Sequence, residues 1–156
     1  AYMDELTGLA NRRKCEEYIK ELETHTEKYC ILCFDLNLLK KINDTYGHEK
    51  GDELIKRFAD VLREVYSLYG ITARTGGDEF VAILNNVSVQ ETEKLISDML
   101  ILIETKNKEE DILKLSTAYG YAMSDEVADS NPHIIYKLAD DRMYECKKKS
   151  KMGRND

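Results

Sequence analysis

The sequence has 156 residues, which fits one domain with a sizeable hydrophobic core. Its 42% hydrophobic and 34% charged residues indicate a folded, soluble protein and exclude a disordered chain. The net charge of -7 argues against a nucleic-acid or anionic-membrane surface, and no apolar run suits a transmembrane helix or signal peptide. Small phosphorylated ligands stay compatible with this charge, because a divalent cation and a few lysines can offset it.

The four cysteines are predicted to be reduced core residues of a cytosolic protein. They are Cys15, Cys30, Cys33 and Cys146. Cys30 and Cys33 lie in a strand-like run, where positions three apart face opposite sides of a sheet. They are therefore poor partners for a disulfide or a shared metal.

The chain opens with a turn-rich stretch over residues 4–13, which leads into a helix that ends near Glu23. The continuous apolar run Tyr29–Phe34 then predicts a central strand, covered by helices on at least one side. Asp35 ends this strand. An acid at that place fits either a metal ligand or the N-cap of the following segment.

Leu38, Leu39 and Ile42 mark a short helix, which Gly47 can end in the left-handed conformation. A phosphate near the start of this helix would meet free backbone N–H groups. Gly51-Asp52 then opens a longer helix that reaches Tyr66. Asp52 fits either an N-cap or a ligand-binding residue.

The stretch Arg74-Thr75-Gly76-Gly77-Asp78-Glu79-Phe80 lies between two strand-like runs, Ile71–Ala73 and Phe80–Leu84. Two glycines there predict a two-residue hairpin turn with positive φ, whose bare backbone a phosphate could approach. Asp78 and Glu79 follow and should point to opposite faces. The pattern fits a solvated surface hairpin or a metal-phosphate site.

The second half of the chain predicts a helix over Val89–Glu104, a strand over Leu113–Met123 and a last helix opened by Asn131-Pro132. Gly120 should mark a point where another backbone approaches the strand closely. The expected buried side of the last helix consists of Ile135, Leu138, Ala139, Met143 and Tyr144. Its basic end, with Lys147 to Lys149, Lys151 and Arg154, fits either a solvated helix cap or a phosphate grip.

This order of elements predicts a single α+β (or α/β) domain over residues 1–156, with a ferredoxin-like mixed sheet of about five strands flanked by helices. Such a sheet can place Asp35, at the end of the first strand, beside Asp78, at the start of the third. Two acids, a helix N-terminus and a basic helix end together indicate a Mg²⁺-nucleotide site.

The residues resemble the GGDEF domain, the diguanylate cyclase family, from Asp4 to Asn155. The resemblance rests on Asp4–Leu9 with Asn11-Arg12-Arg13, Asp35-Leu36-Asn37 with Lys40, Ile42–His48 with Gly51-Asp52, Arg74–Phe80, and Ala139-Asp140 with Tyr144 and Lys147. It implies a fold similar to nucleotidyl cyclase and polymerase palm domains. It also implies condensation of two GTP molecules into cyclic di-GMP and two pyrophosphates across a homodimer, with Mg²⁺, or Mn²⁺ in its place.

Residue by residue, the resemblance assigns the metal to Asp35, Asp78 and the carbonyl of Leu36, and places Glu79 near the reacting hydroxyl with a catalytic role. Further residues are expected to bind substrate: Asn43 and Asp52 at the guanine, and Leu38, Leu39, Lys40, Gly76, Gly77, Lys147 and Arg154 at the phosphates. Gly153-Arg154-Asn155 follows Lys147 at a longer distance than in many members, so Lys151 is an alternative to Arg154.

Ser67–Gly70 stands where many members carry the Arg-x-x-Asp inhibitory motif, so no allosteric inhibitory site is expected. The domain is expected to face the cytoplasm, without direct membrane contact, as a part of a longer regulatory protein with an upstream sensor that a membrane tether could hold. The alternative to an active cyclase is a catalytically silent GGDEF domain that binds GTP or a protein partner.

Overall fold

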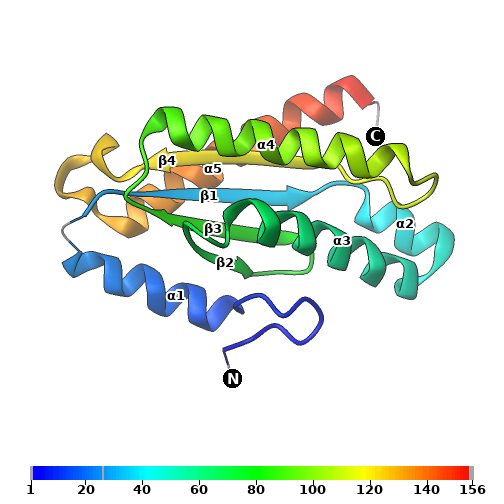
Figure 1. Cartoon of the computed structure of the whole chain (residues 1–156), viewed down its shortest axis with the longest axis horizontal. Helices are drawn as coiled ribbons and strands as arrows, with labels where there is room; N and C mark the ends of the chain where they lie inside the picture. Colours follow the sequence, from blue (N-terminus) through cyan, green and yellow to red (C-terminus); the bar gives the residue numbers. More distant parts are fainter. Residues whose placement is uncertain (1, 26, 155–156) are drawn as a thin grey trace.

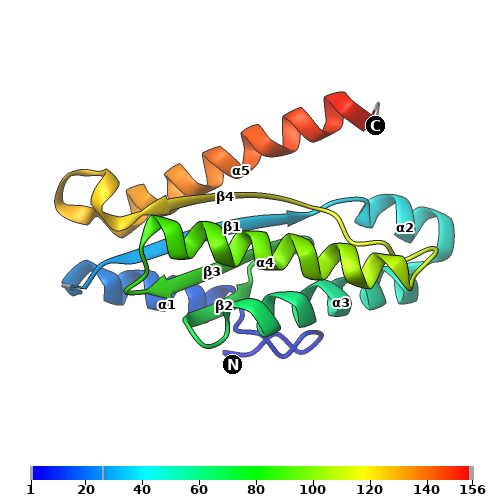
Figure 2. The same cartoon turned by 45° about the horizontal axis from the view of Figure 1, so that its top comes forward.

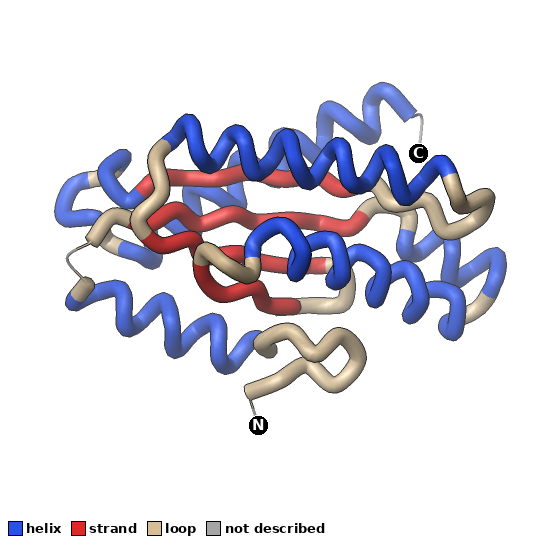
Figure 3. The backbone as a smooth tube through the Cα atoms, in the orientation of Figure 1, coloured by secondary structure: helices blue, strands red, loops and turns tan. Residues whose placement is uncertain are grey.

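The computed structural model describes residues 2–25 and 27–154, the last four of them by backbone alone. In chain order its elements are α1 (Arg12–Glu21), η1 (Leu22–Thr24), β1 (Tyr29–Leu36), α2 (Leu39–Tyr46), α3 (His48–Tyr66), β2 (Gly70–Arg74), β3 (Glu79–Asn85), α4 (Val89–Lys108), β4 (Thr117–Met123), η2 (Ser124–Glu126), η3 (Ala128–Ser130) and α5 (Pro132–Arg154). Helices cover a central sheet on both faces (Figures 1 and 3). Within the described ranges, no helix combines the length and apolar character needed to cross a membrane.

The sheet has the strand order β2-β3-β1-β4, and each neighbouring pair is antiparallel. This arrangement confirms the ferredoxin-like α+β fold, with four strands where about five were predicted. A mixed sheet was predicted, but the parallel pairing consists of an isolated bridge between Ala10 and Ala73 of β2 in the described residues. The predicted strand from Leu113 begins only at Thr117, because the side chain of Asn107 hydrogen-bonds both backbone groups of Leu115 at 2.7 and 2.8 Å.

The central strand β1 is buried along its whole length, as its apolar run predicted. Leu32 and Phe34 belong to the core that packs against α3 and α4, whereas Ile31 and Cys33 belong to the core under α1 and α5. Cys30 lies in the first of these cores. Cys30 and Cys33 are therefore free thiols on opposite faces, which confirms the prediction from their spacing.

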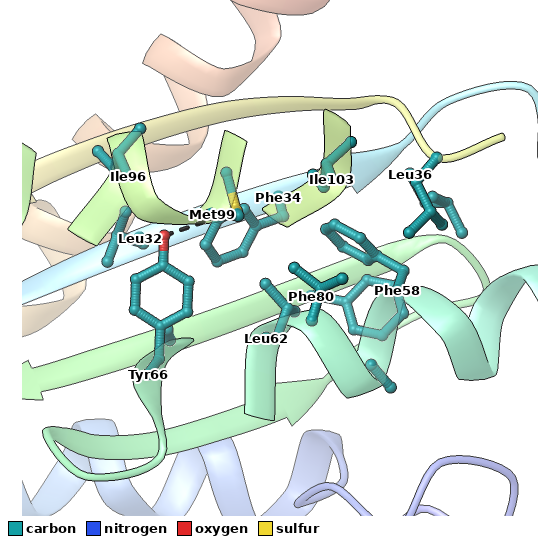
Figure 4. Packing of buried hydrophobic residues seen from close by; sticks show 14 of the residues in the cluster. Leu32, Phe34, Leu36, Phe58, Leu62, Tyr66, Phe80, Ile96, Met99 and Ile103 are labelled. Carbon is teal, nitrogen blue, oxygen red and sulfur yellow. Dashed lines mark hydrogen bonds between the residues drawn. The ribbon is translucent and has the colours of Figure 1, made fainter. Parts of the chain in front are cut away.

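Aromatic rings pack against one another in the core between the sheet and α3, among aliphatic side chains (Figure 4). The ring of Phe58 packs edge-on against Phe80 at 5.0 Å and against Phe34 at 6.1 Å between centroids. The fully buried hydroxyl of Tyr66 lies 3.6 Å from the sulfur of Met99 in α4. The edge-to-face packing of Phe58 against Phe34 and Phe80 adds to the free energy gained by burial alone.

Helix α5 lies directly on β4 (Figure 2). A Cβ atom at Gly120 would stand 2.2 Å from the backbone nitrogen of Met143 and 2.6 Å from the carbonyl oxygen of Ala139. The predicted close approach of another backbone is thus confirmed. Tyr144 is 57% exposed, so its predicted place on the buried side is wrong. It follows the buried Met143 by one residue, which turns it by about 100° around the helix axis.

Candidate metal and phosphate site

The two predicted metal carboxylates come from adjacent strand ends. In the antiparallel pairing of β1 with β3, Asp35 stands opposite Glu79, and the N–H of Leu36 donates to the carbonyl of Asp78 at 2.8 Å. Asp35 and Asp78 therefore lie side by side at one end of the sheet. The sequence predicted this neighbourhood, and the pairing of β1 with β3 produces it.

Asp35 is a buried carboxylate with one unsatisfied oxygen. Its residue exposure is 7%; Oδ2 accepts from Nζ of Lys147 at 2.9 Å, while the buried Oδ1 has no hydrogen-bond partner. Burial raises the pKa of Asp35, Lys147 opposes this shift, and the nearby Asp78 carboxylate adds to it. Two acids facing one lysine leave an excess negative charge that a divalent cation would offset.

This donor set fits Mg²⁺. The ion prefers carboxylate and carbonyl oxygens and keeps waters or substrate phosphates as its other ligands. Asp35, Asp78 and the carbonyl of Leu36 can supply the protein's share. Among the described residues no three His, Cys, Asp or Glu side chains converge on a metal position, so the cation would need ligands from a bound nucleotide.

The loop before β3 differs from the predicted two-residue turn. Strand β2 ends at Arg74 and β3 starts at Glu79, and neither Gly76 nor Gly77 has a positive φ. The N–H groups of Thr75 and Gly76 both donate to the carbonyl of Glu79, at 2.9 and 3.3 Å, which closes a wider loop. A Cβ at Gly77 would meet no atom within 4 Å, so the bare backbone predicted for a phosphate is present.

Glu79 leaves this loop toward the side of the sheet that α1 and α5 cover. Its carboxyl carbon would lie 3.2 Å from a Cβ at Gly76, so the side chain is folded against that glycine. It also lines a cavity of about 360 Å³ between α1 and α5, together with Arg12, Tyr136 and Asp140. The carboxylate therefore borders an open cavity.

Arg74 holds the loop in shape, a role that sequence reasoning missed. Its Nε and Nη2 donate to the carbonyl of Gly77 at 3.2 and 3.0 Å, and its Nη1 pairs with Asp4 Oδ1 at 3.2 Å. Asp4 in turn accepts from the backbone and hydroxyl of Thr7. Arg74 and Asp4 both belong to the motif blocks, but a separation of 70 residues hides their contact in the sequence.

The start of α2 offers backbone donors. Leu38 precedes the helix in the left-handed conformation, with φ 69° and ψ 6°, and no side chain caps the helix. The first N–H groups of a helix have no intrahelical partner, so those at Leu39 and Lys40 suit a phosphate. The Lys40 ammonium pairs with Asp44 at 2.7 Å on the exposed surface, which leaves the backbone of this residue as its contribution.

The two predicted guanine-binding residues are neighbours. A Cβ at Gly51 would stand 1.7 Å from Oδ1 of Asn43, so the amide of Asn43 occupies the space that this glycine leaves, next to Asp52. Helix α2 ends at Tyr46 and α3 starts at His48, with Gly47 between them. Gly47 has a positive φ of 93°, but its ψ of 164° differs from the predicted left-handed helical conformation. Asp52 thus lies in the second turn of α3, and the N-cap interpretation of this residue is wrong.

In the second half of α5, Lys147 contacts the site, and Arg154 is described by its backbone alone. The Lys147 side chain is 28% exposed and bonded to Asp35. Arg154 ends the helix, and its side chain and that of Lys151 lie outside the described residues, so the assignment of one of them to phosphate stays a prediction. Residues 67–69 form the turn between α3 and β2, with Leu68 91% exposed, and Gly70 begins β2.

One end of the ferredoxin-like sheet thus brings together a pair of carboxylates, an uncapped helix start and a lysine, a set of groups that could hold a divalent cation and a phosphate. The chain itself belongs to the GGDEF family: the family profile "Diguanylate cyclase, GGDEF domain" matches residues 1–153. This family assignment agrees with the resemblance of the sequence motifs.

Individual relatives agree with the family. The chain is 31% identical to the probable diguanylate cyclase DgcT of Escherichia coli (strain K12), covering 99% of this chain and 35% of the relative. It is 29% identical to an uncharacterized membrane protein of Staphylococcus aureus (strain USA300), of which it covers 44%. The chain thus spans less than half the length of these curated relatives.

Solved structures share the fold. The GGDEF domain of DgcB from Caulobacter crescentus, determined in complex with c-di-GMP, has a TM-score of 0.83 at 25% identity, covering 95% of this chain and 91% of that one. The GGDEF domain of PA1120 (TpbB or YfiN) from Pseudomonas aeruginosa has a TM-score of 0.82 at 27% identity, with 94% and 89% coverage.

Proposed function

We propose that this domain is a diguanylate cyclase that condenses two GTP molecules into cyclic di-GMP and two pyrophosphates. In each of two equivalent steps a 3′-oxygen bonds to the α-phosphorus of the other GTP, the bond to pyrophosphate breaks, and the hydroxyl loses its proton. The observation that carries this proposal is the meeting of Asp35 and Asp78, with the orphaned Oδ1 of Asp35 available to a cation.

Each group of the site has a proposed task. Bound Mg²⁺, or Mn²⁺ in its place, would supply Lewis-acid stabilisation of charge on the phosphate oxygens. Asp35, Asp78 and the Leu36 carbonyl would hold it, and the backbone at Leu38, Leu39 and Lys40 would bind the terminal phosphates with Lys147. The loop glycines would admit the α-phosphate close to the backbone, and Glu79 would accept a hydrogen bond or the proton from the attacking hydroxyl.

Guanine would be recognised beside the contact of Asn43 with Gly51. A carboxylate such as Asp52 can accept from both N1–H and the 2-amino group of guanine, and adenine lacks that pair of donors. We expect Asp52→Ser to reduce the preference for GTP over ATP about tenfold or more. Competition binding with both nucleotides measures it, and an unchanged preference removes Asp52 from the base site.

One chain supplies one half of the reaction, since the nucleophile belongs to the second GTP. We therefore propose a homodimer as the active form, with dimerisation and input signal supplied by an upstream domain. Relatives named membrane proteins suggest a tether for the full-length protein, with this domain on the cytoplasmic side where GTP is found.

The test uses product analysis. The domain, fused to a parallel dimeric coiled coil, is incubated with GTP and Mg²⁺, and products are identified by mass spectrometry. Wild type should form cyclic di-GMP, while Asp78→Ala should lose at least about a thousandfold in rate with an unchanged unfolding transition. Binding of GTP without cyclic product would reject the cyclase and favour a silent, GTP-binding signalling module.

A further inference from the structure

Lys147 forms an ion pair with Asp35, the carboxylate proposed to bind the metal. Its Nζ lies 2.9 Å from Oδ2 of Asp35, whose side chain is 10% exposed. No other lysine or arginine in the described part of the chain forms an ion pair with Asp35. The same ammonium is the group proposed to bind the terminal phosphates, so one cation has two competing anionic partners.

The helix that carries Lys147 packs closely on the sheet. Backbone contact between Gly120 and Met143, one helical turn before Lys147, leaves no room for α5 to approach β4 further. Rotation of the long lysine side chain can exchange its partners without movement of the helix. Such a side chain has a flexible four-carbon stem and a charge that acts in any direction.

The free oxygen of Asp35 alone does not make a good cation site while Lys147 is bound. A divalent ion at the buried Oδ1 would share the carboxylate with an ammonium on Oδ2, and the two cations repel each other through a poorly solvated environment. Phosphates at the start of α2 would remove this repulsion by drawing the ammonium toward themselves.

We infer that Lys147 makes metal loading depend on the nucleotide: it neutralises Asp35 in the empty site and releases it when nucleotide phosphates arrive. Metal and nucleotide then bind with positive coupling, and Lys147 carries that coupling as a positioning residue. The inference rests on the proposed nucleotide site, yet it concerns metal affinity and not turnover.

The experiment compares Mn²⁺ binding to metal-free wild type, Lys147→Met, Lys147→Gln and Lys148→Met. Lys148 is the matched control, since it is the next residue on α5 and its ammonium contacts Glu145 and the ring of Tyr144, both on its own helix. Free Mn²⁺ is measured by electron paramagnetic resonance, without nucleotide, with pyrophosphate, and with a GTP analogue that has a methylene bridge between its α- and β-phosphates. Circular dichroism checks that each variant is folded.

Without nucleotide, both Lys147 variants should bind Mn²⁺ about tenfold more tightly than wild type, and Lys148→Met should match wild type. Pyrophosphate or the analogue should raise the Mn²⁺ affinity of wild type and of Lys148→Met about tenfold more than that of the Lys147 variants. Equal affinity of wild type and the Lys147 variants in the empty site would overturn the inference, as would weaker binding by the variants. A wild type that forms no cyclic di-GMP would reject the proposed reaction without deciding this comparison.

Discussion

Substitution of Gly120 by alanine tests the contact on which the position of α5 depends. The added Cβ would stand 2.2, 2.6 and 2.7 Å from backbone atoms of Met143, Ala139 and Arg142. Ordinary carbon contacts are about 3.5–4.0 Å, so the helix has to move by on the order of 1 Å. No flexible side chain can give way instead, because all three atoms are in the backbone.

Overpacking of this kind costs about 1–3 kcal/mol. For a domain of this size each kcal/mol lowers the melting temperature by about 2–4 °C, so Gly120→Ala should melt roughly 2–12 °C below wild type. Urea and thermal unfolding followed by far-ultraviolet circular dichroism measure both quantities. The shift of α5 should also move Lys147 away from Asp35 and so weaken an ion pair that is distant from the substituted residue.

Gly77→Ala is the matched control for unfolding. A Cβ there meets no atom within 4 Å and φ is not positive, so its stability should stay within about 0.5 kcal/mol of wild type. If Gly120→Ala is as stable as Gly77→Ala, α5 does not rest on β4 through backbone contact, and the reasoning is wrong.

Three further predictions concern stability. Leu38→Gly should be about 1 kcal/mol more stable than Leu38→Ala in urea, because only glycine adopts the left-handed conformation without strain. A Leu38→Ala variant that is the more stable of the two would contradict this. Phe58→Ala should cost about 3–5 kcal/mol, whereas Leu68→Ala at an exposed site should cost less than about 0.5, and similar losses would refute the core assignment. Burial raises the pKa of Asp35, so ionisation of its carboxylate lowers stability as the pH rises through that pKa. The urea midpoint of Asp35→Asn should therefore increase relative to that of wild type from acid to neutral pH. A difference between the two midpoints that does not change with pH would contradict this.

Patterns along the chain predicted the elements that depend on local periodicity. The run Tyr29–Phe34 indicated a strand buried on both faces, and Gly120 indicated a close backbone approach, because burial and sterics act within a few residues. The position of Asp35 beside Asp78 could be predicted because the rules for connections between strands allow only a few sheet topologies. The site could be predicted to this extent.

Individual side-chain contacts between distant segments could not be predicted. Arg74 pairs with Asp4 of the N-terminal turn, and Lys147 of α5 pairs with Asp35 of β1, through side-chain rotamers that packing selects. The form of the loop around Gly76 was also missed, since two glycines permit a positive φ without requiring one. The exposed Tyr144 shows the same limit on a helix, where one residue separates the buried face from solvent.

The burial of Asp35 also has an evolutionary consequence. Burial raises the pKa of Asp35, so ionisation of this carboxylate at neutral pH costs folding free energy. An uncharged residue would avoid this cost, so we expect substitution of Asp35 to be favoured unless the reaction requires the acid. A lineage that no longer needed the reaction would be expected to lose Asp35 early, while its apolar neighbours Phe34 and Leu36 persisted. Position 35 is thus a sensitive indicator, across related chains, of whether selection still maintains the site.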